Sequence, residues 1–236
     1  MDINFPIRTD VPLPAPRAPA HEAGEPPLKT LKTGTTTVGV VCRDGVVMGA
    51  DMRATMGHLI AHKNTDKLFK IDNHLAMTIA GSVGDAQTLV RWLTSEVEIY
   101  KVKRGAEMSV RAASTLMANI LNQRKFTPFY VQLLVGGVDY EGPAIYSLDA
   151  AGGSIPDKFV TTGSGSVFVY GVLEDHYKDG MSLDEGLDLA VRGLAAAMKR
   201  DSASGDGMNV CSITRKDGFK LLSAEDVAAR RKRMGV

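Results

Sequence analysis

The sequence predicts an α+β protein built as a four-layer α-β-β-α sandwich, in which two antiparallel sheets pack face to face and a helix pair covers each outer face. Three observations predict this fold. Short turn signals such as RDG, DYEG and KDG join pairs of strand-like runs into hairpins. Helix pairs separate these runs, which argues against alternating parallel winding. The helices carry apolar faces that this stacking would bury.

The first elements are two hairpins followed by two helices. Runs 35–42 and 46–53 flank RDG, and runs 67–71 and 75–80 flank DNH, so each pair is expected to form adjacent strands. Apolar residues then recur at helical spacing in two segments. The expected helices are 85–104, which Gly105 ends, and 109–125, which precedes Pro128.

The second half repeats this order. DYEG joins two strand-like runs, SLDE forms a capping box at Ser182–Glu185, and KDG joins the last two runs. The basic segment AARRKRMGV is expected to be a solvated end. The expected elements are strands 131–138 and 143–149, helices 166–178 and from 182 onward, and strands 208–214 and 218–222.

Composition narrows the class of protein. The 236 residues are 44% hydrophobic and 23% charged, which fits a globular chain with a sizeable core. A net charge of +1 gives no reason to expect a nucleic-acid partner. No apolar run approaches the ~18 residues of a membrane span, and no secretory signal is recognised, so we expect a cytoplasmic location and no membrane partner. Cys42 and Cys211 lack CxxC spacing, so they fit a reducing compartment and give no metal site. We also expect no cofactor.

The N-terminal segment differs from the rest of the chain. Seven of the ten prolines fall within residues 1–34, and this segment has neither helical nor strand periodicity. We therefore expect a disordered leader over 1–34 and a folded domain over 35–236.

Residues 34–37, Gly-Thr-Thr-Thr, allow two interpretations. Three β-branched residues suit the start of a strand. Alternatively, the Gly34–Thr35 bond is cut, and Thr35 becomes a new N-terminus and a nucleophile. A threonine hydroxyl needs a base, and in such a residue the α-amine, whose ordinary pKa is about 7.7–8.0, can serve.

Three charged residues lie close to Thr35 in this scheme. Asp51 and Arg53 share one face of their strand, and Lys67 shares a face with Phe69. Taken singly, the first two suit a strand that emerges into solvent, and the lysine suits a side chain that snorkels. Together they form a candidate site.

Many ordered motifs carry a resemblance to a known family. They are TGTTTVGVV, GADMRAT, HKNTDKLFKI, MTIAGSVGDAQ, LLVGG, AAGGS, TTGSGSVFVYGVLE and KRDSASGD. Together they resemble the proteasome β subunit, above all the archaeal type, from about Gly34 to about Arg215. The resemblance implies the N-terminal nucleophile hydrolase fold and threonine endopeptidase activity. It also implies autocatalytic cleavage at Gly34–Thr35, which removes 1–34 as a propeptide.

The resemblance also implies roles for individual residues. Thr35 would be the nucleophile, and the Lys67 ammonium would lower the pKa of the Thr35 amine. Asp51 would hold Lys67 charged and oriented, and Arg53 would support that network. The residues that match those orienting the amine are Ser164, Asp201 and Ser204.

Further matches concern the substrate. The Gly81 N–H would donate to the oxyanion. The mostly apolar positions of the first substrate pocket would be Ala54, Thr65, Phe69, Ile79, Val83 and Gln87. We therefore expect cleavage after large apolar residues.

The partners implied by the resemblance are α subunits and other β subunits in stacked seven-membered rings, with a regulatory ATPase that supplies unfolded protein. Two alternatives stay open. The chain could be a non-enzymatic ring subunit, or a small-molecule amidase with the same N-terminal chemistry.

Overall fold

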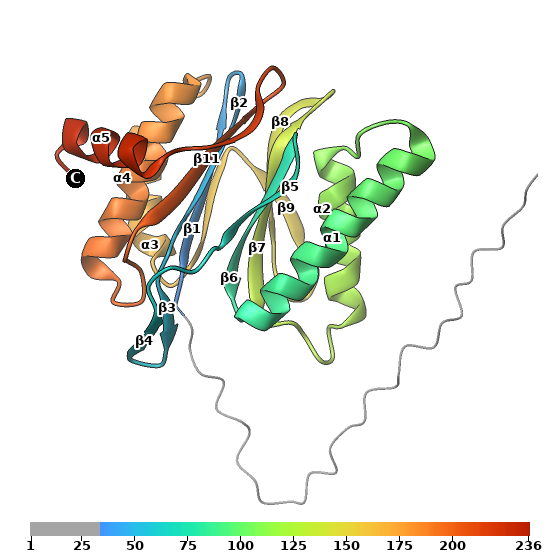
Figure 1. Ribbon diagram of the computed structural model, residues 1–236, viewed down its shortest axis with the longest axis horizontal. Coiled ribbons are helices and arrows are strands. Elements are labelled where there is room, and N and C mark those ends of the chain that lie inside the picture. The colour runs from blue at the N-terminus through green and yellow to red at the C-terminus, as the bar shows by residue number, and fades with distance from the viewer. Residues whose placement is uncertain (1–33) are drawn as a thin grey trace, which may run out of the picture. The chain divides into compact units, whose positions relative to one another are not determined.

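The computed structural model describes residues 34–236, which form two five-stranded antiparallel sheets and five helices (Figure 1). The first sheet has the order β10 (Phe159–Gly163), β1 (Thr36–Cys42), β2 (Gly45–Asp51), β11 (Met208–Thr214) and β12 (Gly218–Leu221). The second sheet has the order β5 (Leu68–Asp72), β6 (Leu75–Gly81), β7 (Val131–Asp139), β8 (Gly142–Leu148) and β9 (Ser154–Asp157).

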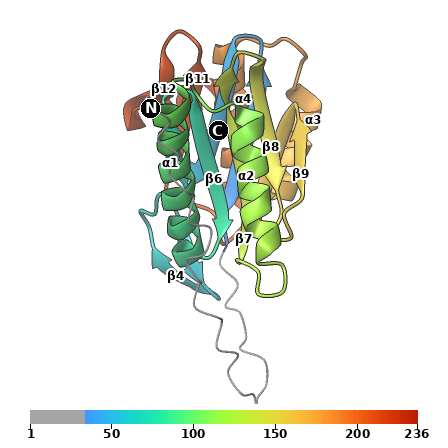
Figure 2. The same ribbon diagram turned by 90° about the vertical axis from the view of Figure 1, so that its right-hand side faces the viewer.

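Helices cover the outer face of each sheet. α1 (Val83–Arg104) and α2 (Val110–Gln123) lie on the second sheet, while α3 (Ser166–His176) and α4 (Leu183–Arg200) lie on the first (Figures 1 and 2). Serine caps start α1, α2 and α4 by accepting a main-chain N–H, and α4 has the full capping box predicted from SLDE. The predicted four-layer α-β-β-α sandwich is confirmed.

Three hydrophobic clusters fill the spaces between these layers. Val46, Met48 and Leu134 belong to the cluster between the two sheets. Leu89 and Met117 belong to the cluster under α1 and α2, and a third cluster lies under α3 and α4. Since both faces of each sheet are buried, β2 is buried at all seven positions.

The structure adds elements that the sequence pattern did not predict. A short hairpin of β3 (Ala54–Met56) and β4 (Leu59–His62) follows β2, and β9 and β10 follow β8. The basic C-terminal segment was predicted to be a solvated end, which is wrong: most of it belongs to α5 (Ala224–Met234), and its Met234 and Val236 pack against the core under α3 and α4. The Arg230 guanidinium pairs with Asp188 of α4 at 2.6 Å, which fixes α5 against that helix.

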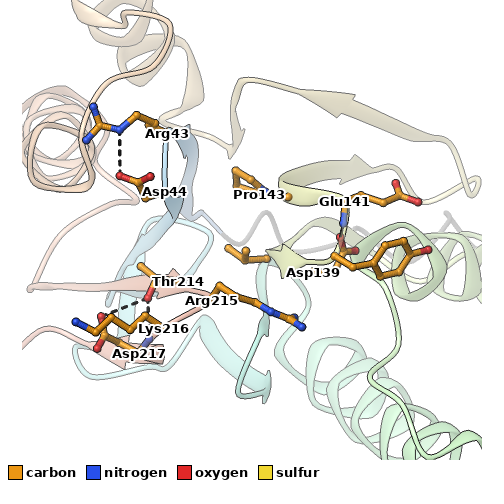
Figure 3. A pocket seen from close by; sticks show the side chains of 12 residues that line it. Arg43, Asp44, Asp139, Glu141, Pro143, Thr214, Arg215, Lys216 and Asp217 are labelled. Carbon is orange, nitrogen blue, oxygen red and sulfur yellow. Dashed lines mark hydrogen bonds and ion pairs between the residues drawn. The ribbon is translucent and has the colours of Figure 1, made fainter.

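Two further features of the described chain bear on function. A hollow of about 550 Å³ lies among the β1–β2, β7–β8 and β11–β12 turns (Figure 3). Thr35 precedes β1, whereas the β1–β2 turn, which is one of the three that line this hollow, follows the opposite end of β1. The hollow is therefore remote from the predicted site. None of the helices within 34–236 is both long and apolar enough to cross a bilayer.

Candidate active site

Thr35 lies immediately before β1 and is only 4% exposed. Its hydroxyl donates to the carbonyl oxygen of Gly34 at 2.7 Å. A Cβ added to Gly34 would lie 1.8 Å from the Cβ of Ala203, so residue 34 must be glycine for the main chain to follow this path. The Gly34–Thr35 peptide bond is therefore enclosed, and the Thr35 hydroxyl contacts its carbonyl oxygen.

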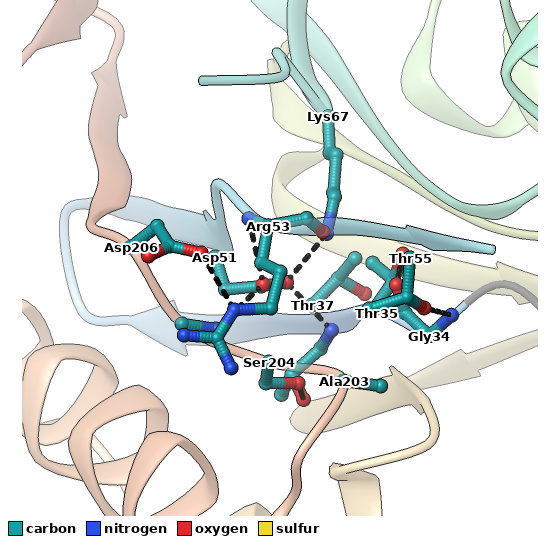
Figure 4. Close-up of polar contacts among 12 residues, drawn as sticks. Gly34, Thr35, Thr37, Asp51, Arg53, Thr55, Lys67, Ala203, Ser204 and Asp206 are labelled. Atoms are coloured by element: carbon teal, nitrogen blue, oxygen red, sulfur yellow. Dashed lines mark hydrogen bonds and ion pairs between the residues drawn. The ribbon is translucent and has the colours of Figure 1, made fainter. Parts of the chain in front are cut away.

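Two hydroxyl groups hold the main chain on either side of this bond. The Gly34 N–H donates to Oγ1 of Thr55 at 2.9 Å, and the Thr35 N–H donates to Oγ of Ser164 at 3.2 Å. Figure 4 shows Gly34, Thr35 and Thr55 together at the edge of the charged network described next.

Asp51 is the centre of that network. Its side chain is fully buried, and its Oδ1 accepts from Lys67 Nζ at 2.8 Å and from the Thr36 N–H at 2.9 Å. Its Oδ2 accepts from the N–H groups of Arg53 and Gly205 at 3.1 and 3.0 Å. Four donors thus compensate the desolvation of one carboxylate.

Lys67 reaches Asp51 from the other sheet. It lies just before β5, and its Nζ also donates to the main-chain carbonyl of Arg53 (Figure 4). Burial lowers the pKa of Lys67 below its ordinary value, and the charge of Asp51 offsets part of that effect. The site therefore holds an ammonium group that releases its proton more readily than an exposed lysine does.

Arg53 joins the network mainly through its main chain. Its guanidinium donates to the Asp206 carboxylate at 2.6 Å and to the Ser202 carbonyl oxygen at 2.9 Å. The hydrogen bond from Arg53 lowers the pKa of Asp206. Asp206 is the one non-glycine residue within 34–236 that has a positive φ, 62°. Thus Arg53 and Asp206 fix the loop between α4 and β11 against the end of β2.

Two serine hydroxyls and the carboxylate of Asp201 link Thr35 to the end of α4. Ser164 and Ser204 both donate to Oδ2 of Asp201, at 2.7 and 2.6 Å. Because the Ser204 proton goes to Asp201, the 2.6 Å contact between Thr36 Oγ1 and Ser204 Oγ has the threonine as donor. The structure thus joins Ser164, Asp201 and Ser204 by hydrogen bonds, and Ser164 is the member that accepts from the Thr35 N–H.

The predicted substrate-binding residues lie on β3, β5, β6 and α1 and in the segment between β4 and β5. Gly81 ends β6 with a φ of 124°, and a Cβ there would lie 2.0 Å from the Tyr130 carbonyl oxygen, so no other residue fits. Ile79 is in the hydrophobic core under α1 and α2, with Phe69 packed against it. The remaining predicted pocket positions are Ala54 on β3, Thr65 between β4 and β5, and Val83 and Gln87 on α1.

Sequence reasoning missed Thr55, Ala203 and Asp206. Thr55 is on a three-residue strand, which is too short to show a period. Ala203 and Asp206 lie in the RDSASGDG loop, whose small and polar residues give no pattern that separates a contact residue from its neighbours. No signal in the sequence alone would have found them.

The order of the layers, with a threonine at the start of the first strand, defines the N-terminal nucleophile hydrolase fold. The chain matches the proteasome subunit family model over residues 31–213, and it therefore belongs to that family.

Curated relatives agree with this assignment. The "Proteasome subunit beta" of Methanothermobacter thermautotrophicus is 55% identical over 201 residues, which cover 85% of this chain and 95% of that protein. The proteins of the same name from Thermoplasma acidophilum and Picrophilus torridus are 51% and 53% identical, and each alignment covers 88% of this chain and 98% of the relative.

Proposed function

We propose that this chain is the catalytic β subunit of a proteasome core particle, a threonine-type endopeptidase with Thr35 as its nucleophile. The family and the curated β-subunit relatives support the activity. One observation carries the choice of nucleophile: the Thr35 hydroxyl lies 2.7 Å from the carbonyl oxygen of the residue that precedes it. The Lys67–Asp51 pair is bound to the next residue of the chain, because Asp51 accepts a hydrogen bond from the Thr36 N–H.

The first reaction in this proposal is self-cleavage, which removes residues 1–34 as a propeptide. Thr35 Oγ bonds to the Gly34 carbonyl carbon, the bond from that carbon to the Thr35 nitrogen breaks, and the hydroxyl proton ends on the nitrogen. Water then hydrolyses the resulting ester, which releases the Gly34 carboxylate and restores the Thr35 hydroxyl. The product is an N-terminal threonine with a free amine.

The second reaction is hydrolysis of a substrate peptide bond. The Thr35 amine takes the proton of its own hydroxyl, and the nearby Lys67 charge lowers the pKa of that amine so that more of it is free base. Asp51 orients Lys67. The hydroxyl chain of Ser164, Asp201 and Ser204 lies at the Thr35 nitrogen and orients the amine.

The Gly81 N–H supplies a donor for the oxyanion of the tetrahedral intermediate. Loss of such a donor costs about 2.7–4 kcal/mol in barrier height. We propose a preference for large apolar residues at the cleavage site, because the predicted pocket includes Ala54, Phe69, Ile79 and Val83 and offers no ion partner.

The proposed assembly has α subunits and β subunits in stacked seven-membered rings. A regulatory ATPase feeds unfolded protein into the enclosed chamber of this particle, where Thr35 cuts it. A cytoplasmic location fits this role. Metal ions and cofactors have no part in the proposed reactions.

Intact mass and N-terminal sequencing of the chain purified with its α subunits test the proposal. We expect a chain that starts at Thr35, hydrolyses fluorogenic peptides that end in a large apolar residue, and is labelled on Thr35 by a peptide epoxyketone. Thr35→Ala should abolish cleavage and hydrolysis. An uncut wild-type chain without hydrolysis would indicate a non-enzymatic ring subunit, and amidase activity without labelling or a large particle would indicate a small-molecule amidase.

A further inference from the structure

The hydroxyl of Thr55 contacts a residue that the proposed self-cleavage removes. The Gly34 N–H donates to Thr55 Oγ1 at 2.9 Å, and the contact is buried. We propose that Thr55 is a positioning residue for self-cleavage, whose hydroxyl anchors the main chain on the propeptide side of the Gly34–Thr35 bond. This inference rests on the proposed function.

Gly34 needs such an anchor because of its residue type. A glycine has wide freedom in both main-chain dihedrals and no side chain that packing could fix. A rotation at Gly34 would turn its carbonyl away from the Thr35 hydroxyl, which lies 2.7 Å from the carbonyl oxygen. The bond to Thr55 restrains this rotation from one side, and the close approach to Ala203 restrains it from another. Together they keep the reacting groups near the geometry of attack.

The environment of Thr55 suits this role. Thr55 is 5% exposed and lies in the middle of β3, which pairs with β4. A buried hydroxyl in a paired strand has a fixed position, so the main chain bound to it is also fixed.

The contact exists only in the uncut chain. Attack by Thr35 Oγ forms the ester and breaks the bond between the Gly34 carbonyl carbon and the Thr35 nitrogen, and the hydroxyl proton moves to that nitrogen. Water then releases Gly34 as a carboxylate with the propeptide. Thr55 therefore loses this partner after cleavage. The substrate residue that later takes the place of Gly34 has a side chain that the pocket can hold, which Gly34 lacks, so a change at Thr55 should affect self-cleavage more than later peptide hydrolysis.

Two forms of each variant test this difference. In the first, the full chain is assembled with its α subunits, and intact mass follows the appearance of the chain that starts at Thr35. In the second, the chain starts at Thr35 after a ubiquitin fusion is removed, and peptide hydrolysis is measured on the assembled particle. We expect Thr55→Val to slow self-cleavage about tenfold more than it slows hydrolysis, the effect of one lost buried hydrogen bond. Thr55→Ser, which keeps the hydroxyl, should restore most of the rate.

Thr78→Val is the matched control. Thr78 is fully buried, and its hydroxyl has no hydrogen-bond partner within the described residues, so this variant should change neither rate. Equal self-cleavage by wild type and Thr55→Val would overturn the role of Thr55, and so would equal losses of self-cleavage and hydrolysis. An uncut wild-type chain would instead overturn the proposed self-cleavage, and this role with it.

Discussion

The two partners of the buried ion pair should differ in their importance for stability. Asp51→Asn leaves the Lys67 ammonium in a buried site without its counter-ion. Each oxygen of Asp51 accepts two hydrogen bonds: Oδ1 from Lys67 and Thr36, and Oδ2 from Arg53 and Gly205. Asparagine replaces one of these oxygens by an NH2 group, which cannot accept, so that group faces two donors. Removing one partner of a buried pair in this way costs about 3–5 kcal/mol.

Lys67→Met leaves a better-compensated group behind. Asp51 keeps its three main-chain N–H donors, so the loss is that of one charge-assisted hydrogen bond, about 1.5–3 kcal/mol. For a domain of this size, 1 kcal/mol shifts the melting temperature by about 2–4 °C. We therefore expect Asp51→Asn to lower the melting temperature by about 6–20 °C and Lys67→Met by about 3–12 °C.

Calorimetry or circular dichroism on particles carrying each variant measures these shifts, with Thr78→Val as a buried-threonine control. Both site variants should lose peptide hydrolysis, so activity does not distinguish them and the melting temperature does. If Lys67→Met proves as destabilising as Asp51→Asn, the three N–H donors do not compensate the carboxylate, and the reasoning fails.

Three further predictions follow from the same structure. Gly34→Ala should block self-cleavage, since its Cβ would lie 1.8 Å from that of Ala203, and adding Ala203→Gly should restore part of it; intact mass detects both, and no recovery would contradict the packing argument. Burial lowers the Lys67 pKa, so between that lowered value and about 10.4 the unfolded chain binds more protons and stability rises with pH. The melting temperature of wild type minus that of Lys67→Met should therefore increase from pH 7 to pH 10, and a constant difference would count against the shift. Burial raises the pKa of both Cys42 and Cys211 to about 12, so neither should react with a disulfide reagent at pH 8 until denaturant is added, whereas labelling of the folded chain would contradict their burial.

The layered fold was predictable because its elements have strong periods and clear ends. The predicted helix 85–104 corresponds to α1 at Val83–Arg104, and the predicted strands 208–214 and 218–222 correspond to β11 and β12. The hairpin of β3 and β4 was not predictable, since three- and four-residue strands show no period.

The C-terminal helix α5 was missed for a different reason. Its AARRKRM segment is strongly charged, and composition alone favours a solvated end. Contacts distant in the sequence stabilise it: Arg230 pairs with Asp188, 42 residues away, and Val227 is buried in the core under α4. Tertiary packing therefore outweighs the composition of the segment.

The candidate site was predictable only in part. Alternation along the strands suggested Asp51, Arg53 and Lys67 as site residues beside Thr35, and the resemblance supplied their individual roles, which stay predictions. Contacts such as Thr55 with Gly34, or Asp206 with Arg53, depend on where loops meet in three dimensions. No spacing along the chain encodes them.

The ion pair between Lys67 and Asp51 has a consequence for the timing of activity. The lysine comes from the edge of one sheet and the carboxylate from a strand of the other, so the pair forms only after the two sheets have docked. A half-folded chain has the threonine but not the charged groups around it. In the proposed self-cleavage, the cut at Gly34–Thr35 therefore follows the docking of the two sheets, and the free Thr35 amine appears only in a chain whose tertiary structure is complete.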